Sequence, residues 1–349
     1  MVFASIGYDL PELVAGVHSV ADGVPTIGCS TSGEIGPGPA LADGVVVVAL
    51  GGEFSVTTTS AVGLTERSRW VGEEIGRGSL PLPDNRYQVT IMLTDALAGD
   101  QQEMIRGAYG VLGATVPLIG GGGGDSLGVL TSRQFHNGQI HQDAVVAATI
   151  GTDGPIGLSI RHGWQRHGTV MAVTRSEGNE LFTLDDRPAL DVYLDRHRAP
   201  EGLDANPAAF AEFGLTRPLA VARRGDVAVR HVLSGDPVTR SVTCAGSVPK
   251  GAAAWLATGD IASTLAAADA ACADATQQLG DSALLGLLVF DCGGRRAVLG
   301  DDGVIAEHQV MHERAGTAPL AGFYTCGEIA RTRGVHGFHN QTIVALALS

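Results

Sequence analysis

One short sequence pattern recurs three times and constrains the fold more than any other feature of the chain. Each version places a short apolar run before a stretch of small residues, mostly glycine, and then a carboxylate, at residues 24–35, 116–125 and 322–329. The first two share Val-Pro-x-Ile-Gly, and the first and third share Gly-x-x-Thr-x-Gly-Glu-Ile. The second and third are each followed by Phe-His-Asn, which ends at Asn137 and Asn340. This repetition predicts one supersecondary unit used several times, with several small-residue loops available to build one site.

Hydrophobic periodicity around the three versions predicts an α/β protein of two domains, with mixed sheets built from repeated strand–helix–strand–glycine-loop units. The elements expected in the three units are strands at residues 2–5, 24–28, 45–50, 89–93, 116–119, 144–150, 285–290 and 342–348, and helices at residues 10–20, 100–112 and 305–314. The stretch between the second and third units differs from them. There we expect strands at residues 169–173, 181–184, 228–232 and 241–244, helices at residues 188–196 and 261–279, and a surface excursion at residues 201–218. The turn-rich residues 175–179 are the expected domain boundary.

Composition excludes several classes of partner and compartment. The 349 residues carry a formal net charge of −14 with no basic run, which argues against nucleic acid or an anionic membrane as a partner. The apolar runs are too short to span a bilayer, and the N-terminus lacks the features of a signal peptide. The five cysteines are odd in number and form no Cys-x-x-Cys. We therefore expect reduced thiols and a cytoplasmic protein.

In residues 27–35, 120–125 and 173–179 the chain resembles the FIST sensory-domain family, with N-terminal and C-terminal FIST modules in tandem. Residues 184–190, 289–292 and 322–329, together with Asn340, carry the C-terminal part of the resemblance, which covers essentially the whole chain. It implies modules at residues 1–177 and 178–349 and a bacterial signal-transduction protein that senses small ligands, amino acids among them. Some family members are regarded as haem-binding nitric-oxide sensors. Members usually carry a segment before the strand at residues 2–5, so we expect either a missing edge strand in the first sheet or a misassigned start codon.

The glycine loops and their carboxylates suit a small zwitterion. Glycine backbone N–H groups can point at an anion, and Glu34, Asp125 or Glu328 can hold an ammonium group. The alternative is that the glycines make tight turns and the carboxylates cap exposed N–H groups. No loop has the ending of a phosphate-binding loop, so nucleotide binding is not expected.

We therefore predict one ligand site, without a resident metal or cofactor, where residues 28–36 meet residues 120–128 and 322–340, between the domains. The predicted ligand-binding residues are Gly28, Cys29, Ser30, Thr31, Gly33, Glu34, Gly121, Gly122, Gly123, Asp125, Arg295, Thr325, Cys326, Gly327, Glu328, His339 and Asn340. Arg295 follows a glycine pair at a strand end, where it can bind a carboxylate ligand or lie solvated on the surface. The interpretation is a ligand-binding sensor rather than an enzyme, with its output passed to a separate signalling partner or through a change of shape.

Two other functions remain open at this point. A haem-based gas sensor would use His136 or His339 as axial ligand, since both stand in Phe-His-Asn, although a surface or hydrogen-bonded role is favoured for each histidine. A thiol-dependent enzyme would use Cys29 or Cys326, which lie in motif loops. No cation is adjacent to Cys326 in sequence to lower its pKa, and a small buried apolar role is favoured for both thiols.

Overall fold

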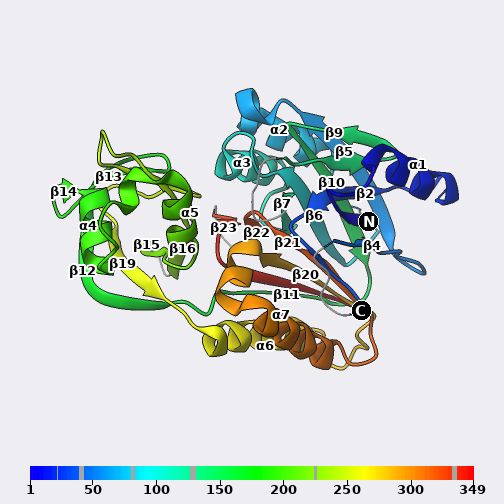
Figure 1. Cartoon of the computed structure of the whole chain (residues 1–349). Helices are drawn as coiled ribbons and strands as arrows, with labels where there is room; N and C mark the ends of the chain where they lie inside the picture. The colour runs from blue at the N-terminus through cyan, green and yellow to red at the C-terminus, as the bar shows by residue number, and fades with distance from the viewer. Residues whose placement is uncertain are drawn as a thin grey trace.

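The chain leaves a main lobe at residue 165, forms a smaller inserted lobe of residues 165–258, and then returns (Figure 1). The structure is a computed structural model that describes residues 1–21, 23–38, 43–79, 82, 84–125, 131–223, 226–331 and 336–349. Both lobes combine helices with mixed or antiparallel sheets, which confirms the predicted α/β class.

Three sheets form the main lobe. The first contains, in spatial order, β4 (Val45–Val47), β1 (Val2–Ser5), β2 (Ile27–Thr31), β8 (Gln134–His136) and β9 (Gln139–His141). The second contains β23 (Phe338–His339), β22 (Glu328–Arg331), β7 (Leu118–Gly123), β6 (Tyr87–Asp95), β10 (Ala144–Thr152) and β5 (Ser55–Val62). The third contains β11 (Ile156–Arg161), β24 (Ile343–Leu348), β20 (Gly286–Cys292), β21 (Leu320–Thr325) and β3 (Glu34–Ile35).

The second and third sheets pack face to face between two pairs of helices. These are α2 (Leu64–Gly78) and α3 (Gln101–Leu112) on one side, and α6 (Ile261–Gln277) and α7 (Gly293–Ala315) on the other. Alternation along single strands produces this layering: on β20, Leu288 and Phe290 enter the core between the sheets, whereas Leu287 and Val289 face α6 and α7. Helix α1 (Leu10–Val20) covers the first sheet, whose strand β1 lies inside the sheet between β2 and β4.

The inserted lobe has its own core, and two paired strands connect it to the main lobe. Its sheet contains β16 (Asp226–Arg230), β15 (Leu219–Arg223), β19 (Ala253–Thr258), β12 (Gln165–Glu177), β13 (Glu180–Leu184), β18 (Val242–Cys244) and β17 (Val232–Gly235), with β14 (Arg187–Pro188) beside β13. Its helices are α4 (Ala189–His197), the short 3-10 helix η1 (Leu203–Ala205) and α5 (Pro207–Leu215). Strands β12 and β19 pair from Gln165 opposite Thr258, so one two-stranded ribbon joins the lobes.

Distant parts of the chain share the main-lobe sheets. Strand β3 pairs with β21, β7 with β22, and β11 with β24, so strands from the early and late parts of the chain are neighbours in both the second and third sheets. These pairings carry the repeated motifs into contact with one another. None of the helices in the described part of the chain is both long enough and apolar enough to cross a membrane.

The structure corrects two expectations about elements near the predicted site. The glycine run is not a loop: most of it is the end of β7, which pairs with β6 on one side and β22 on the other. Helix α7 begins at Gly293, well before the expected residue 305, and bends at Gly300, where φ is 62°. Its three early glycines disguise the helix because glycine has low helix propensity.

The stretch at residues 201–218, expected as a surface excursion, also contains regular structure. It holds η1 and α5, and α5 is anchored in the core of the inserted lobe by the buried Phe210. Residues 175–179, expected as the domain boundary, form the end of β12 and the turn into β13.

Candidate functional site: an interlobe pocket

The three repeated motifs meet at one place in the main lobe. The Ser32 N–H donates to the Tyr324 carbonyl at 3.0 Å, and the Tyr324 N–H donates to the Gly33 carbonyl at 2.8 Å. These bonds join the first and third motifs. We call the meeting point, formed by residues 30–34, 120–124 and 324–328, the triple-turn junction.

The second motif joins the junction through its glycines. The Gly122 N–H donates to the Gly327 carbonyl, and the Cys326 N–H donates back to the Gly122 carbonyl, both at 2.9 Å. The Gly124 N–H donates to the Ser30 carbonyl at 3.0 Å. Of the loops predicted to converge, residues 126–128 and 332–335 lie outside the described residues.

The glycines of the second motif are packed against protein rather than open to a ligand. A Cβ atom on Gly121 would lie 2.5 Å from the Thr325 Cγ2 atom, and one on Gly122 would lie 2.7 Å from the Ala96 Cβ atom. A Cβ atom on Gly123 would lie 2.9 Å from the Ser30 carbonyl oxygen. The structure therefore gives these glycines the role of close backbone contact.

The two motif glutamates are buried and are held by threonines of their own turns. Thr31 Oγ1 donates to Glu34, and Thr325 Oγ1 donates to Glu328, in equivalent positions of the first and third motifs. Glu328 also accepts the Thr342 N–H at 3.1 Å and the Thr342 hydroxyl at 2.7 Å. Burial raises the pKa of each carboxyl to about 7. Neither glutamate lies in the wall of the pocket described below, so the structure does not place them as an ammonium clamp.

Arg295 is not a surface charge, and it does not line the pocket described below. It lies in the first turn of α7, fully buried, and forms ion pairs with Asp291 at 2.6 Å and Glu307 at 2.5 Å. Its guanidinium group also donates to the His162 and Thr264 carbonyl oxygens. The expected solvated surface position of Arg295 is thus wrong, and the buried carboxylates of Asp291 on β20 and Glu307 on α7 already pair with its guanidinium group. Asp125 is also buried, and it does not line the pocket described below.

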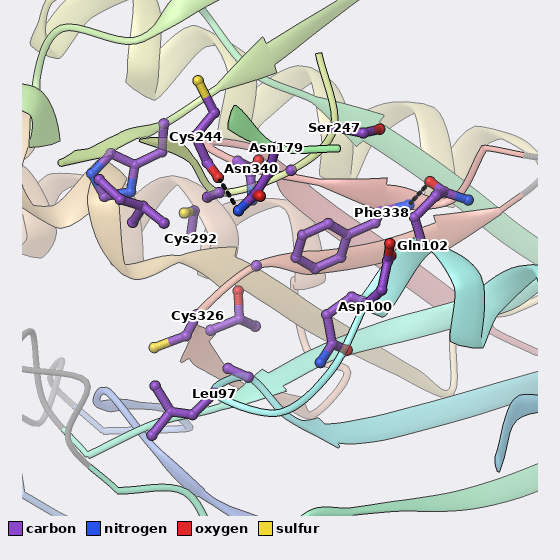
Figure 2. Close-up of a pocket in the computed structure, with 18 of the residues that line it drawn as sticks. Leu97, Asp100, Gln102, Asn179, Cys244, Ser247, Cys292, Cys326, Phe338 and Asn340 are labelled. Atoms are coloured by element: carbon purple, nitrogen blue, oxygen red, sulfur yellow. Dashed lines mark hydrogen bonds between the residues drawn. The ribbon is translucent and has the colours of Figure 1, made fainter. Parts of the chain in front are cut away.

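Beside the triple-turn junction lies a pocket of about 710 Å³, between the two lobes (Figure 2). The main lobe contributes the start of α3, the turn at residues 325–327, the start of α7, and Phe338 and Asn340. The inserted lobe contributes the following residues: Gly178, Asn179, Leu215, His231, Leu233, Cys244, Ala245, Gly246 and Ser247. The volume falls in the range of small-molecule sites, roughly 300–1,000 Å³.

Asn340 is the most unusual side chain in the pocket wall. It is 3% exposed, and its Oδ1 atom has no hydrogen-bond partner among the described residues. By contrast, the neighbouring Asn179 donates from Nδ2 to the Cys244 carbonyl at 3.1 Å (Figure 2). A buried amide oxygen without a donor costs about 1–3 kcal/mol, so its presence calls for an explanation.

Three cysteine side chains, Cys244, Cys292 and Cys326, come to this pocket from different elements (Figure 2). Burial raises the pKa of Cys326 to about 11 and that of Cys244 to about 12, and it holds that of Cys292 well above its usual value. Cys29, inside β2, is fully buried, and burial raises its pKa as well. All these thiols are protonated near neutral pH, which does not favour the thiol-enzyme hypothesis.

The two Phe-His-Asn histidines do not enter the interlobe pocket. His136 on β8 contacts the Thr58 hydroxyl at 3.1 Å through Nε2. His339 contacts the Ala330 carbonyl at 3.0 Å and lies in the wall of a second pocket of about 570 Å³, which residues of both lobes line. Within the described ranges, no three His, Cys, Asp or Glu side chains are grouped as a metal site.

Comparison with known proteins now identifies the family. The FIST N domain matches residues 1–187, and the FIST C domain matches residues 189–331. This chain belongs to the FIST family. It is therefore a FIST sensory-domain protein, as the motifs predicted.

Three relatives that match this FIST protein are each named an uncharacterized protein. An uncharacterized protein of Methanocaldococcus jannaschii is 28% identical over 180 residues, which is 48% of this chain and 34% of the relative. Two uncharacterized proteins of Mycobacterium tuberculosis are 29% identical over 192 residues and 27% identical over 216 residues. These alignments cover 52% and 58% of this chain, and 48% and 54% of the respective relatives. The chain thus spans between about a third and about half of the length of these relatives.

The structure divides the predicted site residues of the FIST protein into two groups. Thr325, Cys326, Gly327 and Asn340 lie in the pocket wall. The others lie in the interior or elsewhere: Gly28, Cys29, Ser30, Thr31, Gly33, Glu34, Gly121, Gly122, Gly123, Asp125, Arg295, Glu328 and His339. Most of the predicted motif residues therefore lie outside the pocket wall, in the protein interior around it.

Sequence reasoning missed most of the wall supplied by the inserted lobe. Residues 244–247 carry no motif, and only the fold brings them opposite the third motif. Two signals were present. Asn179 and the Gly293-Gly294 pair both stood in or beside family motifs, but neither was assigned a site role.

Proposed function

We propose that this FIST protein is a cytoplasmic sensor that binds an amino-acid-like small molecule in the interlobe pocket. The observation that carries the proposal is the pocket between the lobes, whose wall includes the buried Asn340 amide with an Oδ1 atom that has no hydrogen-bond partner among the described residues. A ligand with an N–H or O–H donor would satisfy this oxygen. The cost of leaving it unpaired in the free protein would then be recovered on binding.

The other wall residues support a small amphipathic ligand. Leu97, Leu215 and Phe338 supply apolar surface, and Asn179, Ser247 and Asn340 are polar residues of the same wall. An amino acid combines these two features in one molecule of suitable size. The five cysteines of the chain are all unpaired, which supports a reducing compartment.

The position of the pocket supports a signalling role. Its walls come from both lobes, and the lobes are joined by the β12–β19 ribbon. A ligand that contacts both walls favours the closed arrangement, and a separate partner protein would read the change.

The test is binding of the individual L-amino acids to the wild-type protein and to Asn340→Leu, measured by calorimetry and thermal unfolding. We expect one or a few amino acids to bind the wild type. Asn340→Leu should lose that binding by roughly tenfold or more, while its ligand-free stability stays equal or rises because a buried unpaired oxygen is removed. A loss of ligand-free stability would instead make Asn340 a structural residue.

Native mass spectrometry of the purified protein completes the test. If no amino acid binds but another small molecule is retained and is lost in Asn340→Leu, the amino-acid part of the proposal is wrong and the pocket remains the site. If nothing binds and nothing is retained, the pocket assignment is wrong.

A further inference from the structure

Two arginine side chains of the inserted lobe converge on one backbone carbonyl. Arg230, on β16, is 1% exposed, and its Nε atom donates to the Ser247 carbonyl at 3.1 Å. The half-buried Arg223, on the neighbouring β15, donates to the same carbonyl at 3.2 Å and to the Ser247 hydroxyl at 3.4 Å. The remaining printed contact of Arg230 is also to a neutral group, the Val229 carbonyl at 2.9 Å. The Nε atom of Arg223 is buried without a hydrogen-bond partner among the described residues.

No carboxylate of the described side chains pairs with either of these guanidinium groups. The contrast with the equally buried Arg295 is clear, because Arg295 pairs with two carboxylates. Burial, and then the nearby charge of Arg223, lower the pKa of Arg230 to about 9. A desolvated charge is costly without a counter-ion, and two adjacent like charges add to that cost. The pair therefore indicates a place for an anion, in a chain that has 37 acidic residues available for pairing.

The main lobe brings two further basic side chains to this place. His336 comes just before β23, and the Phe338 N–H of β23 donates to Gln102 Oε1 on α3 at 3.4 Å. Strand β23 also contacts β16 of the inserted lobe. These contacts place the exposed His336 at the seam between the lobes, near Arg106 of α3 and near the end of β16.

The basic side chains at this seam face one another across the two lobes. We call the following four residues the basic seam: Arg106 and His336 of the main lobe, and Arg223 and Arg230 of the inserted lobe. Burial, followed by the charges of all three arginines, lowers the pKa of His336, so the four groups are close enough to repel. Arg106 forms an ion pair with Glu103, which leaves the two arginines of the inserted lobe as the cations available to a ligand.

We infer that the basic seam binds a phosphate group, free or carried by a small molecule, between the two lobes. Two guanidinium groups balance the charge of nearly −2 that a phosphate carries near neutral pH, and their paired N–H donors match its oxygens. A carboxylate would neutralise only one of them. Ser247 and Phe338 both line the interlobe pocket, so the basic seam lies next to that pocket (Figure 2). The inference does not depend on which molecule occupies the pocket itself.

Calorimetry on the full chain in phosphate-free buffer of low ionic strength tests the ligand class. The probes are inorganic phosphate, glycerol phosphate and acetate. Both phosphates should bind, and acetate should bind about tenfold or more weakly, since it leaves one guanidinium group without a partner. Tighter binding of glycerol phosphate would identify a phosphorylated small molecule as the source, and tighter binding of inorganic phosphate would identify the free ion. Equal affinities for acetate and for both phosphates would overturn the inference.

Three variants test the residues. Arg223→Gln, at a half-buried position, should weaken phosphate about tenfold or more. Arg230→Met removes the buried charge and should weaken phosphate similarly, with equal or higher stability in the absence of ligand. Arg198→Gln removes the same charge from an exposed position of the same lobe and should leave the affinity unchanged. Unchanged affinity in Arg223→Gln, together with a large loss of stability in Arg230→Met, would make both arginines structural. An equal loss of affinity in Arg198→Gln would reduce the effect to net charge.

Hydrogen exchange tests the position between the lobes. Phosphate should slow exchange in residues 245–247 of the inserted lobe and in residues 336–338 of the main lobe together. Protection of only one of these segments would overturn binding between the lobes. The outcomes also separate this inference from the proposed function. Absence of phosphate binding, in a protein that still binds an amino acid, would overturn the basic seam alone. Phosphate binding by a protein that binds no amino acid would support the seam and leave the proposed function without its ligand.

Discussion

At the scale of single residues, the two motif glutamates change from expected ligand groups to buried structural groups. Glu328 is fully buried and accepts hydrogen bonds from Thr325 and Thr342. The burial that excludes it from the pocket also raises its pKa, so the folded protein holds a proton there that the unfolded chain releases at lower pH.

Glu328→Gln tests this role through the pH dependence of stability. The wild-type carboxyl has a pKa of about 7 when folded and about 4.5 when unfolded, so its stabilising contribution is complete below about pH 4.5 and is lost as pH rises to about 7. This difference corresponds to about 3 kcal/mol in the free energy of unfolding. Glutamine resembles the protonated acid, and the variant should therefore gain stability relative to wild type between about pH 4.5 and 8. Urea unfolding across that range measures it, with the exposed Glu53→Gln as control. Parallel pH profiles for wild type and Glu328→Gln would contradict the buried-acid interpretation.

At the scale of strands, one glycine of each motif has a common purpose that the sequence did not reveal. A Cβ atom on Gly28 would lie 2.2 Å from the Val2 carbonyl oxygen of the parallel strand β1. Gly120 stands in the same relation to the Met92 carbonyl of β6, at 2.1 Å, and Gly322 to the Val289 carbonyl of β20, at 1.7 Å. The repeated glycine therefore marks close contact between parallel strands in all three units.

Gly28→Ala should accordingly destabilise the protein by about 3 kcal/mol, because a backbone carbonyl cannot move aside as a flexible side chain can. Gly16→Ala in α1 is the matched control. A Cβ atom there meets nothing within 4 Å, and alanine has the higher helix propensity, so stability should rise by up to about 1 kcal/mol. Thermal and urea unfolding measure both variants. A Gly28→Ala protein as stable as wild type would refute the packing explanation.

The same strands show how far sequence reasoning reaches. Local patterns were sufficient for α1, where Asp9 caps a helix with apolar spacing, and for β1, and both elements have the expected bounds. They failed at α7, since glycines concealed its first turns, and at the glycine run of β7. Local patterns also predicted that Glu34, Glu328 and Arg295 bind the ligand. Whether a charged side chain faces a pocket or a buried partner depends on tertiary contacts such as Thr342 with Glu328, which no local pattern encodes.

At the scale of the whole molecule, the proposed sensor depends on movement between the lobes. The main lobe holds the triple-turn junction and the start of α7, whereas residues 178–179 and 244–247 of the inserted lobe form the facing wall. The β12–β19 ribbon connects the lobes, and the hydrogen bond from Gln341 to the Leu215 carbonyl crosses between them at 2.9 Å. If the ribbon acts as a hinge, as the proposal requires, one ligand would order both walls together.

Hydrogen exchange followed by mass spectrometry tests this coupling with an amino acid that binds or with whichever molecule the protein retains. Exchange should slow together in residues 178–179, 244–247 and 293–294. The slowing could reach about 100-fold at about 100 times the Kd, if exchange requires an open form that does not bind ligand. Helix α1 packs against the first sheet and does not line the pocket. It should exchange at an unchanged rate and provides the internal control. Asn340→Leu treated with the same ligand should show no slowing in any of these segments. Protection confined to the main lobe would mean that the ligand binds without closing the lobes, and the signal would then have to leave the protein by a route other than lobe movement.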